Sequence, residues 1–392
     1  MSIFFDVEDD FNFDIERQGL LDNLSYLMNM SVQEQTLYKK WNECQQYKSK
    51  NDSNKNTSFK IWQPKNILDI DSTLREIEDL KPKLLLVENE YQETDWLNLR
   101  IFSHSMSWDA NPGRLIKLLV IDENTDKFLG ISSIASDVTA LTPRDKIIGW
   151  TMDDRFAKKK INHTCIATTI CATQPFGYNF LGTKLIASLL TTNFIRDLWE
   201  KMYDNVLVGM TTTSLYGQGS VYNSIPWWKS IGESEGKIIT KPDDYVYDKW
   251  HMWLKENDSI EYERHILKTD DEGNRINVTS PKQKIIKMIF KHLGIKEKDF
   301  IHGYHRGVYF SPFYTNFREF LTDKITKDEL ILNPKMSNDV KGVIDWWKIK
   351  AINRYKKLHS ENKIKAEKLY YSDVPFMTWE QTKEKYLSDI GR

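Results

Sequence analysis

Residues 170–190, ICATQPFGYNFLGTKLIASLL, carry a pattern that can bind a phosphate group. A β-branched run ends at a Gln-Pro pair, two glycines follow, and an amphipathic helix pattern then begins. A strand that passes through a glycine-bearing turn into a helix directs unpaired backbone N–H groups towards an anion over the turn. We therefore expect Gln174, Gly177, Gly182 and Thr183 to bind a cofactor. A turn with no ligand is the alternative interpretation.

A second group of polar residues lies in TTTSLYGQGSVY, at 211–222. Hydroxyl side chains end a predicted strand there, and glycines and tyrosines follow in the loop, where sheet proteins often place their sites. A tyrosine can donate a proton or stack on a base, although a tight aromatic turn is the alternative. We expect catalytic residues at Tyr216, Ser220 and Tyr222, and substrate-binding residues at Thr213 and Ser214.

Four further residues have side chains suited to chemistry. His104 follows a predicted helix and can act as a general base or a metal ligand, or only as a hydrogen-bonded histidine at a helix end. Arg144 and Asp145 can position a phosphate or form a structural ion pair. Asn162, before a predicted strand, can read adenine because an amide has a donor and an acceptor, or it can be a turn residue. We expect His104 to be catalytic and the other three to bind substrate.

Basic residues gather near the end of the sequence. Residues 341–370 contain nine Lys or Arg against three acidic residues, in a chain whose net charge is -1. A basic helix of this kind can bind the phosphate backbone of DNA, and a solvated helix face is the alternative. The residues that we expect to contact nucleic acid are Lys348, Lys350, Arg354, Lys356 and Lys357.

The composition of the 392 residues is that of a soluble protein with more than one domain, with 40% hydrophobic and 28% charged residues. Three cysteines without Cys-x-x-Cys spacing fit a reducing compartment. We find no apolar run of membrane-spanning length, no signal-peptide pattern, no P-loop and no His-Glu-x-x-His motif. We expect a cytoplasmic protein (host cytoplasm if phage-encoded) with DNA as its partner, no membrane association and no metal site, unless His104 contributes to one.

The pattern of hydrophobic residues predicts three regions. Residues 1–58 read as amphipathic helices and a polar linker, and residues 59–240 as an α+β domain with a mixed central sheet flanked by helices. Residues 241–392 read as a mostly helical, basic region. The oligomeric state is left open.

The order of predicted elements across 85–235 resembles the GNAT acyltransferase fold. FLGISSIAS resembles the central hairpin of that fold, ICATQPFGYNFLGTKL its cofactor motif, and NVLVGMTTTS its last strand. The resemblance implies a GNAT-like domain, a donor such as acyl-CoA or another small acyl donor, and a tyrosine as general acid. The usual motif has Gly or Ala two residues after its first glycine, whereas Tyr178 and Asn179 follow Gly177 here. Their bulk argues against an ordinary CoA site.

A closer resemblance rests on RDKIIGW (144–150), the Asn162-His163 pair, SLYGQGSVY and WWKSIGESEGK. Together these stretches resemble the domain of Druantia protein A, an anti-phage defence component, over roughly residues 85–240. The layout also resembles Mom, a GNAT-like phage enzyme that alters adenine, whose His-Tyr motif corresponds to His104-Ser105.

These resemblances imply a phage-type DNA-modifying enzyme that transfers a small acyl-type group to a nucleobase. The base would have to leave the stack and enter an aromatic pocket. Two other hypotheses remain open: a non-catalytic nucleic-acid-binding module of a phage or defence system, and a structural or virion-associated protein.

Overall fold

The computed structural model describes residues 11–50, 60–108, 113–214, 220–234, 237–267, 281–303, 305–335, 339–366 and 371–389. The chain forms two compact units, and each is assembled from segments that are separate in the sequence. The larger unit comprises Thr36–Glu235 and His305–Arg392, and the smaller unit comprises Met1–Gln35 and Gly236–Tyr304. The predicted boundaries at 58 and 240 rest on changes in composition. The two units instead reflect which segments pack together, because a strand late in the sequence pairs with the sheet that the earlier strands form.

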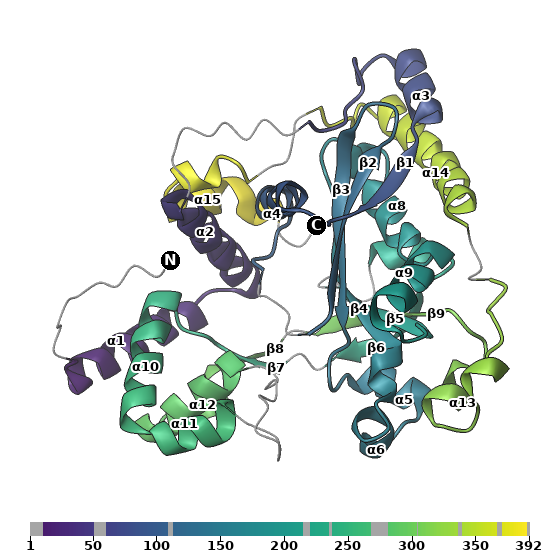
Figure 1. The fold of residues 1–392 in the computed structure, drawn as a ribbon. Coiled ribbons are helices and arrows are strands. Elements are labelled where there is room, and N and C mark those ends of the chain that lie inside the picture. Colours follow the sequence, from purple (N-terminus) through teal and green to yellow (C-terminus); the bar gives the residue numbers. More distant parts are fainter. Residues whose placement is uncertain are drawn as a thin grey trace. The chain divides into compact units, whose positions relative to one another are not determined.

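A mixed sheet forms the centre of the larger unit, with the strand order β1-β2-β3-β4-β5-β9-β6 (Figure 1). Neighbouring strands are antiparallel except β4 and β5, which are parallel. Mixed strand directions and abundant helices confirm the predicted α+β class. The strands are β1 (Pro82–Leu86), β2 (Leu115–Asp122), β3 (Lys127–Ser136), β4 (Thr164–Ala172), β5 (Gly209–Ser214), β6 (Lys229–Ser234) and β9 (Arg306–Pro312).

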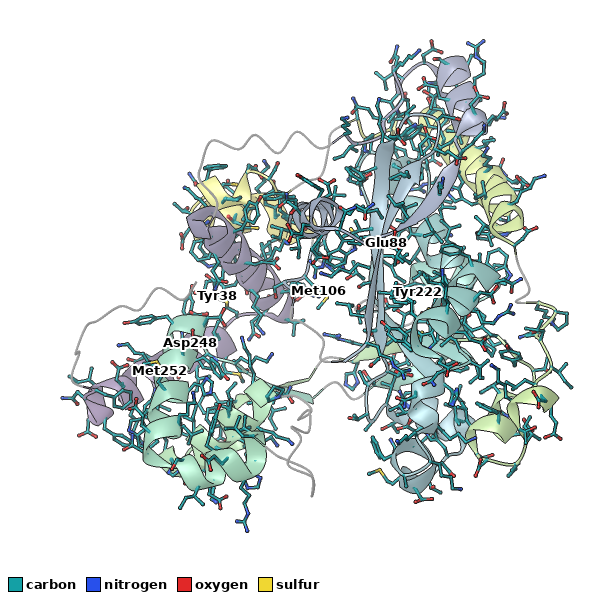
Figure 2. The ribbon with its side chains drawn as sticks, in the orientation of Figure 1. Tyr38, Glu88, Met106, Tyr222, Asp248 and Met252 are labelled. Atoms are coloured by element: carbon teal, nitrogen blue, oxygen red, sulfur yellow. The ribbon has the colours of Figure 1, made fainter. Side chains whose placement is uncertain are left out.

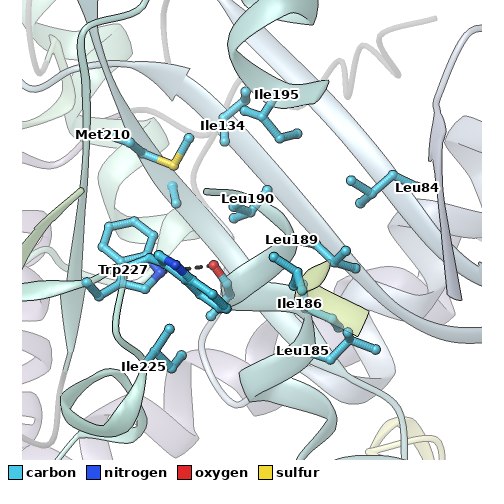
Figure 3. Packing of buried hydrophobic residues seen from close by; sticks show 14 of the residues in the cluster. Leu84, Ile134, Leu185, Ile186, Leu189, Leu190, Ile195, Met210, Ile225 and Trp227 are labelled. Atoms are coloured by element: carbon cyan, nitrogen blue, oxygen red, sulfur yellow. Dashed lines mark hydrogen bonds between the residues drawn. The ribbon is translucent and has the colours of Figure 1, made fainter. Parts of the chain in front are cut away.

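Helices cover both faces of this sheet (Figure 1). On one face lie α8 (Gly182–Leu189) and α9 (Asn193–Tyr203), whose apolar side chains form the main core with Ile134, Met210 and Trp227 (Figure 3). On the other face lies α4 (Glu90–Ser103), where the indole N–H of Trp96 donates to the backbone oxygen of Ser132 at 3.0 Å. The strands between these layers are nearly continuous in hydrophobicity because both of their faces are covered.

The C-terminal region packs back onto the larger unit. The long helix α14 (Val340–Ser360) buries Val343, Trp347, Ala351, Tyr355 and Leu358, which recur at helical spacing. The first four of these residues belong to the same core as α8, so α14 forms an outer layer over it. The remaining helices of this unit are α2 (Val32–Lys50), which begins in the smaller unit, α3 (Ile70–Asp79), α5 (Thr142–Ile148), α6 (Met152–Phe156), α7 (Phe176–Asn179), α13 (Phe317–Leu321) and α15 (Trp379–Tyr386).

The smaller unit is mostly helical and has its own core around Trp250, Ile286 and Phe290. It contains α1 (Phe13–Met28), α10 (Asp244–Asn257), α11 (Ser259–Ile266), α12 (Pro281–Leu293) and the antiparallel pair β7 (Lys237–Ile239) and β8 (Ile301–Gly303). Among the helices of either unit that the structure describes, none combines the length and apolarity needed to cross a membrane.

Candidate phosphate-binding site

The parallel strands β4 and β5 separate before they end. They pair only from Thr164 with Gly209 to Ala167 with Thr212, although β4 continues to Ala172. Beyond Ala167, β4 has no described strand partner on the β5 side, while β3 still pairs with its other edge. Backbone N–H and C=O groups along a separated strand need another partner, so this edge is open to a ligand or to side chains.

The turn after β4 uses most of its backbone N–H groups internally. The N–H of Gly177 donates to the backbone oxygen of Thr173 at 2.7 Å, and the N–H of Tyr178 donates to Oε1 of Gln174 at 3.0 Å. Gln174 and Gly177, expected to bind a cofactor, therefore shape this turn. No side chain caps the N-terminus of α8, which begins at Gly182. The positive end of the helix dipole at Gly182 and Thr183 is thus the part of the predicted motif that is suited to an anion.

Gly182 itself is required by packing. A Cβ atom at this position would lie 2.4 Å from the ring of Phe176, which is completely buried, and 2.9 Å from Cβ of Ala172. The residue thus permits close contact between α8 and the end of β4.

Four basic side chains gather beside this helix end: Lys184, Lys350, Arg354 and Lys365, hereafter the α8 cation cluster. Burial and the neighbouring charges of Lys350 and Arg354 lower the pKa of Lys184. The guanidinium of Arg354 and the ammonium of Lys365 lie 5.2 and 4.7 Å from the ring centre of Tyr178. In the described part of the chain, none of the four forms an ion pair with a carboxylate. Cations that repel each other around a helix N-terminus form a suitable site for a phosphate.

Two contacts fix α14 and the following segment against the turn. The indole N–H of Trp347 donates to the backbone oxygen of Phe180 at 2.8 Å. The side chain of Asn179 donates to the backbone oxygen of Lys365 at 2.7 Å and accepts from its N–H at 3.0 Å. The bulky Asn179, which departs from the usual GNAT motif, thus connects the turn to a segment that supplies cations.

The structure divides the residues expected to contact nucleic acid. Lys350 and Arg354 belong to the α8 cation cluster, next to the expected cofactor residues. Lys348 instead donates to the backbone oxygen of Glu78, and Lys357 lies 3.8 Å from Glu361. Lys356 is exposed on α14. The predicted cofactor site and part of the predicted nucleic-acid site therefore lie at the same place in the structure.

His104 lies at the C-terminal end of α4, on the opposite side of the sheet. Its Nδ1 accepts a hydrogen bond from the N–H of Met106 at 3.1 Å, so the neutral ring carries its hydrogen on Nε2. Burial and the charges of Arg100 and Lys40 lower the pKa of His104 well below its usual range. Among the described residues, no three His, Cys, Asp or Glu side chains are arranged to hold a metal ion.

Tyr222 lies on the α8 side of the sheet, across from Met106 (Figure 2). It is buried between the rings of Trp228 and Tyr309, at 5.7 and 5.0 Å. The hydroxyl of Ser220 accepts from the N–H of Tyr222 at 3.2 Å and so caps a short 3-10 helix. The structure therefore does not bring His104 and Tyr222 together. Tyr216 lies outside the described residues.

Arg144 and Asp145 form part of a buried ionic network. The guanidinium of Arg144 contacts Asp137 at 2.7 Å and Asp145 at 2.7 and 2.9 Å. Asp145 also accepts from Trp150 and Arg155, both at 2.9 Å. With the Arg144 side chain fully buried, this network joins α5 to the loop after β3. Its geometry is that of the structural ion pair weighed above as an alternative to substrate binding.

The remaining expected residues lie at the two ends of the β4–β5 pair. Asn162 precedes β4, and its backbone oxygen accepts from Arg114 at 3.1 Å. Thr213 and Ser214 end β5, where they pair with Val308 and Gly307 of β9. These residues are therefore separated along the sheet by the length of the paired strands.

Sequence reasoning missed Lys184 and Lys365 as members of the cation cluster. Lys184 directly follows the predicted cofactor motif, and its spacing two residues after Gly182 was an available signal. The only sequence signal for Lys365 was the basic composition of its segment. Its proximity to Tyr178 depends on tertiary packing, which the sequence does not show locally.

Comparison with known proteins identifies the family. The sequence profile described as Druantia protein DruA matches residues 33–323. The chain is 27% identical over 256 residues to Druantia protein DruA of Escherichia coli (strain UMEA 4076-1), and the alignment covers 61% of each protein. No solved structure matches the chain. This protein therefore belongs to the Druantia protein DruA family.

The family match confirms the resemblance drawn from RDKIIGW and the segments after it. It is also wider than the predicted 85–240, since it begins in α2 and continues through the smaller unit as far as residue 323. The α8 cation cluster combines residues inside this match with Lys350, Arg354 and Lys365, which follow it.

Proposed function

We propose that this protein is a GNAT-like group transferase that acts on DNA in anti-phage defence and holds a phosphate-bearing donor at the N-terminus of α8. The observation that carries the proposal is the α8 cation cluster, which gathers unpaired positive charge at an uncapped helix end. A phosphate placed there would interact with the helix dipole and with at least Lys184 and Arg354.

The fold supports this placement. The chain order of hairpin, strand, glycine turn, helix and strand is the order on which the GNAT resemblance rests, and it is realised by β2, β3, β4, α8 and β5. The N-terminus of α8 follows the part of β4 that is separated from β5. A donor bound there could lie along the unpaired edge of β4 and reach towards Thr213. A donor held by its phosphate at α8 would then lie along β4.

The proposed reaction is transfer of a small acyl-type group to a nucleobase. An exocyclic amine would attack the donor carbonyl, and the leaving group would depart with the proton that the amine loses. Tyr222, on the α8 side, is our candidate for the general acid. His104, expected as a general base or a metal ligand, is on the far side of the sheet and its Nδ1 already accepts a hydrogen bond, so we assign it no role in this reaction.

Donor binding can be tested with the full chain. We expect coenzyme A or inorganic pyrophosphate to bind in isothermal titration calorimetry. Arg354→Met should weaken that binding about tenfold or more, because it removes a charge-assisted contact. Lys356→Met, an exposed position on the same helix outside the cluster, is the matched control and should bind as the wild type does. Equal weakening in both variants would contradict the site.

A non-catalytic DNA-binding module is the second candidate, favoured by the separation of His104, at the end of α4, from Tyr222, which lies in the core on the α8 side of the sheet. In that case Lys350 and Arg354 would contact the DNA backbone directly. Each lost phosphate contact lowers the slope of log K against log salt by about 0.9. Salt-dependent duplex binding that Arg354→Met weakens, without any change to the DNA, would favour this candidate over the transferase.

A further inference from the structure

A second group of cations is buried on the α4 side of the sheet, distinct from the α8 cation cluster. It contains Lys40 of α2 and Arg100 of α4, with 0% and 3% of their surface exposed. Both charges act on His104 and on Cys171 of β4, so the four side chains lie close together. We call this group the Lys40–Arg100 cluster.

One carboxylate pairs with one of the two cations. Glu43 accepts from the ammonium of Lys40 at 2.7 Å and, through its other oxygen, from the N–H of Trp108 at 2.9 Å. Arg100 has no carboxylate partner among the described residues, and one terminal N–H donates to the backbone oxygen of Met106 at 2.6 Å. The guanidinium of Arg100 is therefore the excess charge of the cluster, although burial lowers the pKa of both Lys40 and Arg100.

Two buried polar atoms beside this excess charge lack a hydrogen-bond partner among the residues that the structure describes. They are Nε of Arg100 and Oγ of Ser103, one helical turn apart on α4. A buried guanidinium is costly to leave unpaired, and native proteins rarely leave such donors unsatisfied. The Nε edge of a guanidinium is also an edge that pairs with two oxygens of a carboxylate or phosphate.

We propose that the Lys40–Arg100 cluster binds an oxyanion, a carboxylate or phosphoryl group of a small ligand, through Arg100 Nε and Ser103 Oγ. The excess charge supplies the attraction, and the two unpaired polar atoms supply the hydrogen bonds. Tyr371 of the C-terminal segment lies beside the cluster: its ring centre is 5.7 Å from the Lys40 ammonium, and its backbone N–H donates to the backbone oxygen of Phe102 at 2.8 Å. The inference is independent of the proposed donor site, since the cluster contacts Cys171 from the face opposite α8.

Thermal unfolding of the full chain, followed at constant ionic strength with added sodium phosphate or sodium acetate, tests this proposal. We expect a saturable rise in melting temperature with at least one of the two anions, and the more effective one identifies the group. Because phosphate is also expected at the α8 cation cluster, the titrations are repeated in the Arg354→Met chain, where adding Arg100→Met should abolish the rise. Ser103→Ala, which keeps the charge and the helix, should raise the half-saturating concentration about tenfold.

Arg354→Met separates the two cation clusters, because it weakens anion binding at α8 and should leave the rise that depends on Arg100. If Arg100→Met does not fold, as judged by circular dichroism, Ser103→Ala decides the outcome. The proposal is overturned if neither anion gives a saturable rise, if Ser103→Ala responds like the wild type, or if Arg354→Met removes the effect. The first outcome would mean that water occupies the two unpaired positions, and the last would assign the anion to α8.

Discussion

Replacing Arg144 tests whether the RDKIIGW stretch stabilises the fold or binds a substrate. Arg144→Met removes the contacts to Asp137 and Asp145 at 2.7 Å and the bond to the backbone oxygen of Val138 at 2.8 Å. Asp145 retains Arg155 at 2.9 Å, but Asp137 has a side chain with 0% exposure and loses its cation. Removing one partner of a buried pair usually costs about 3–5 kcal/mol, so we expect a loss in that range.

Equilibrium unfolding of the full chain in urea, followed by tryptophan fluorescence, measures this loss. Lys146→Met, at an exposed position of the same helix, is the control and should change the free energy of unfolding by less than about 0.5 kcal/mol. Asp137→Asn combined with Arg144→Met should recover part of the loss, because no buried charge is then left alone. A loss below about 1 kcal/mol in Arg144→Met would refute the structural role and restore the substrate-binding hypothesis.

Three further predictions follow from side-chain packing and titration. Gly182→Ala should cost about 1–3 kcal/mol in the same unfolding assay, because the added methyl group clashes with a buried ring. At Gly177 an added Cβ would lie 2.7 Å from Nε2 of Gln174, the end of a flexible side chain, and 3.3 Å from Cβ of Ala172, so Gly177→Ala should cost less; equal losses would contradict this. The pKa of His104 in the folded chain is well below 6.5, so the stability that its neutral ring contributes is present above pH 6.5 and is lost as the pH falls. A pH titration of the His104 ring followed by proton NMR should show a neutral ring at pH 6. A charged ring at that pH would be inconsistent with its burial. Burial raises the pKa of the Cys44 and Cys171 thiols to about 11, so iodoacetamide at pH 7.5 should label them only after unfolding, and rapid labelling of the folded chain would show that they are accessible.

The elements of the fold could be predicted because their patterns are local. The apolar run after Leu115, the glycine turn at 173–182 and the helical spacing of the residues after Gly182 each identify an element from neighbouring residues. The position of β9 between β5 and β6 in the sheet could not be predicted from neighbouring residues, because a long helical insertion separates β6 from β9 in the sequence. That insertion also explains why the compact units differ from a division by composition.

The candidate site could be predicted only in part. Gly182, Lys350 and Arg354 were each recognised, but as members of two sites, because no local pattern shows that α14 packs beside α8. The hydrogen bonds between Asn179 and Lys365 join residues that are 186 positions apart in the sequence. They hold the segment after α14 beside the glycine turn, so that the two predicted sites form one. Conversely, His104 and Tyr222 were both expected to be catalytic, and the sheet separates them, which a linear pattern cannot reveal.

The central claim, that a donor held at α8 is used to modify DNA, is tested most directly by nucleoside mass spectrometry. DNA would be compared from cells that express the wild type, Tyr222→Phe and Arg354→Met, with Lys356→Met as control. We predict a new nucleoside with the wild type and the control, and its loss in the other two variants. A nucleoside profile that stays unchanged with the wild type, while the protein binds DNA in a salt-dependent manner, would contradict the transferase and leave the DNA-binding module.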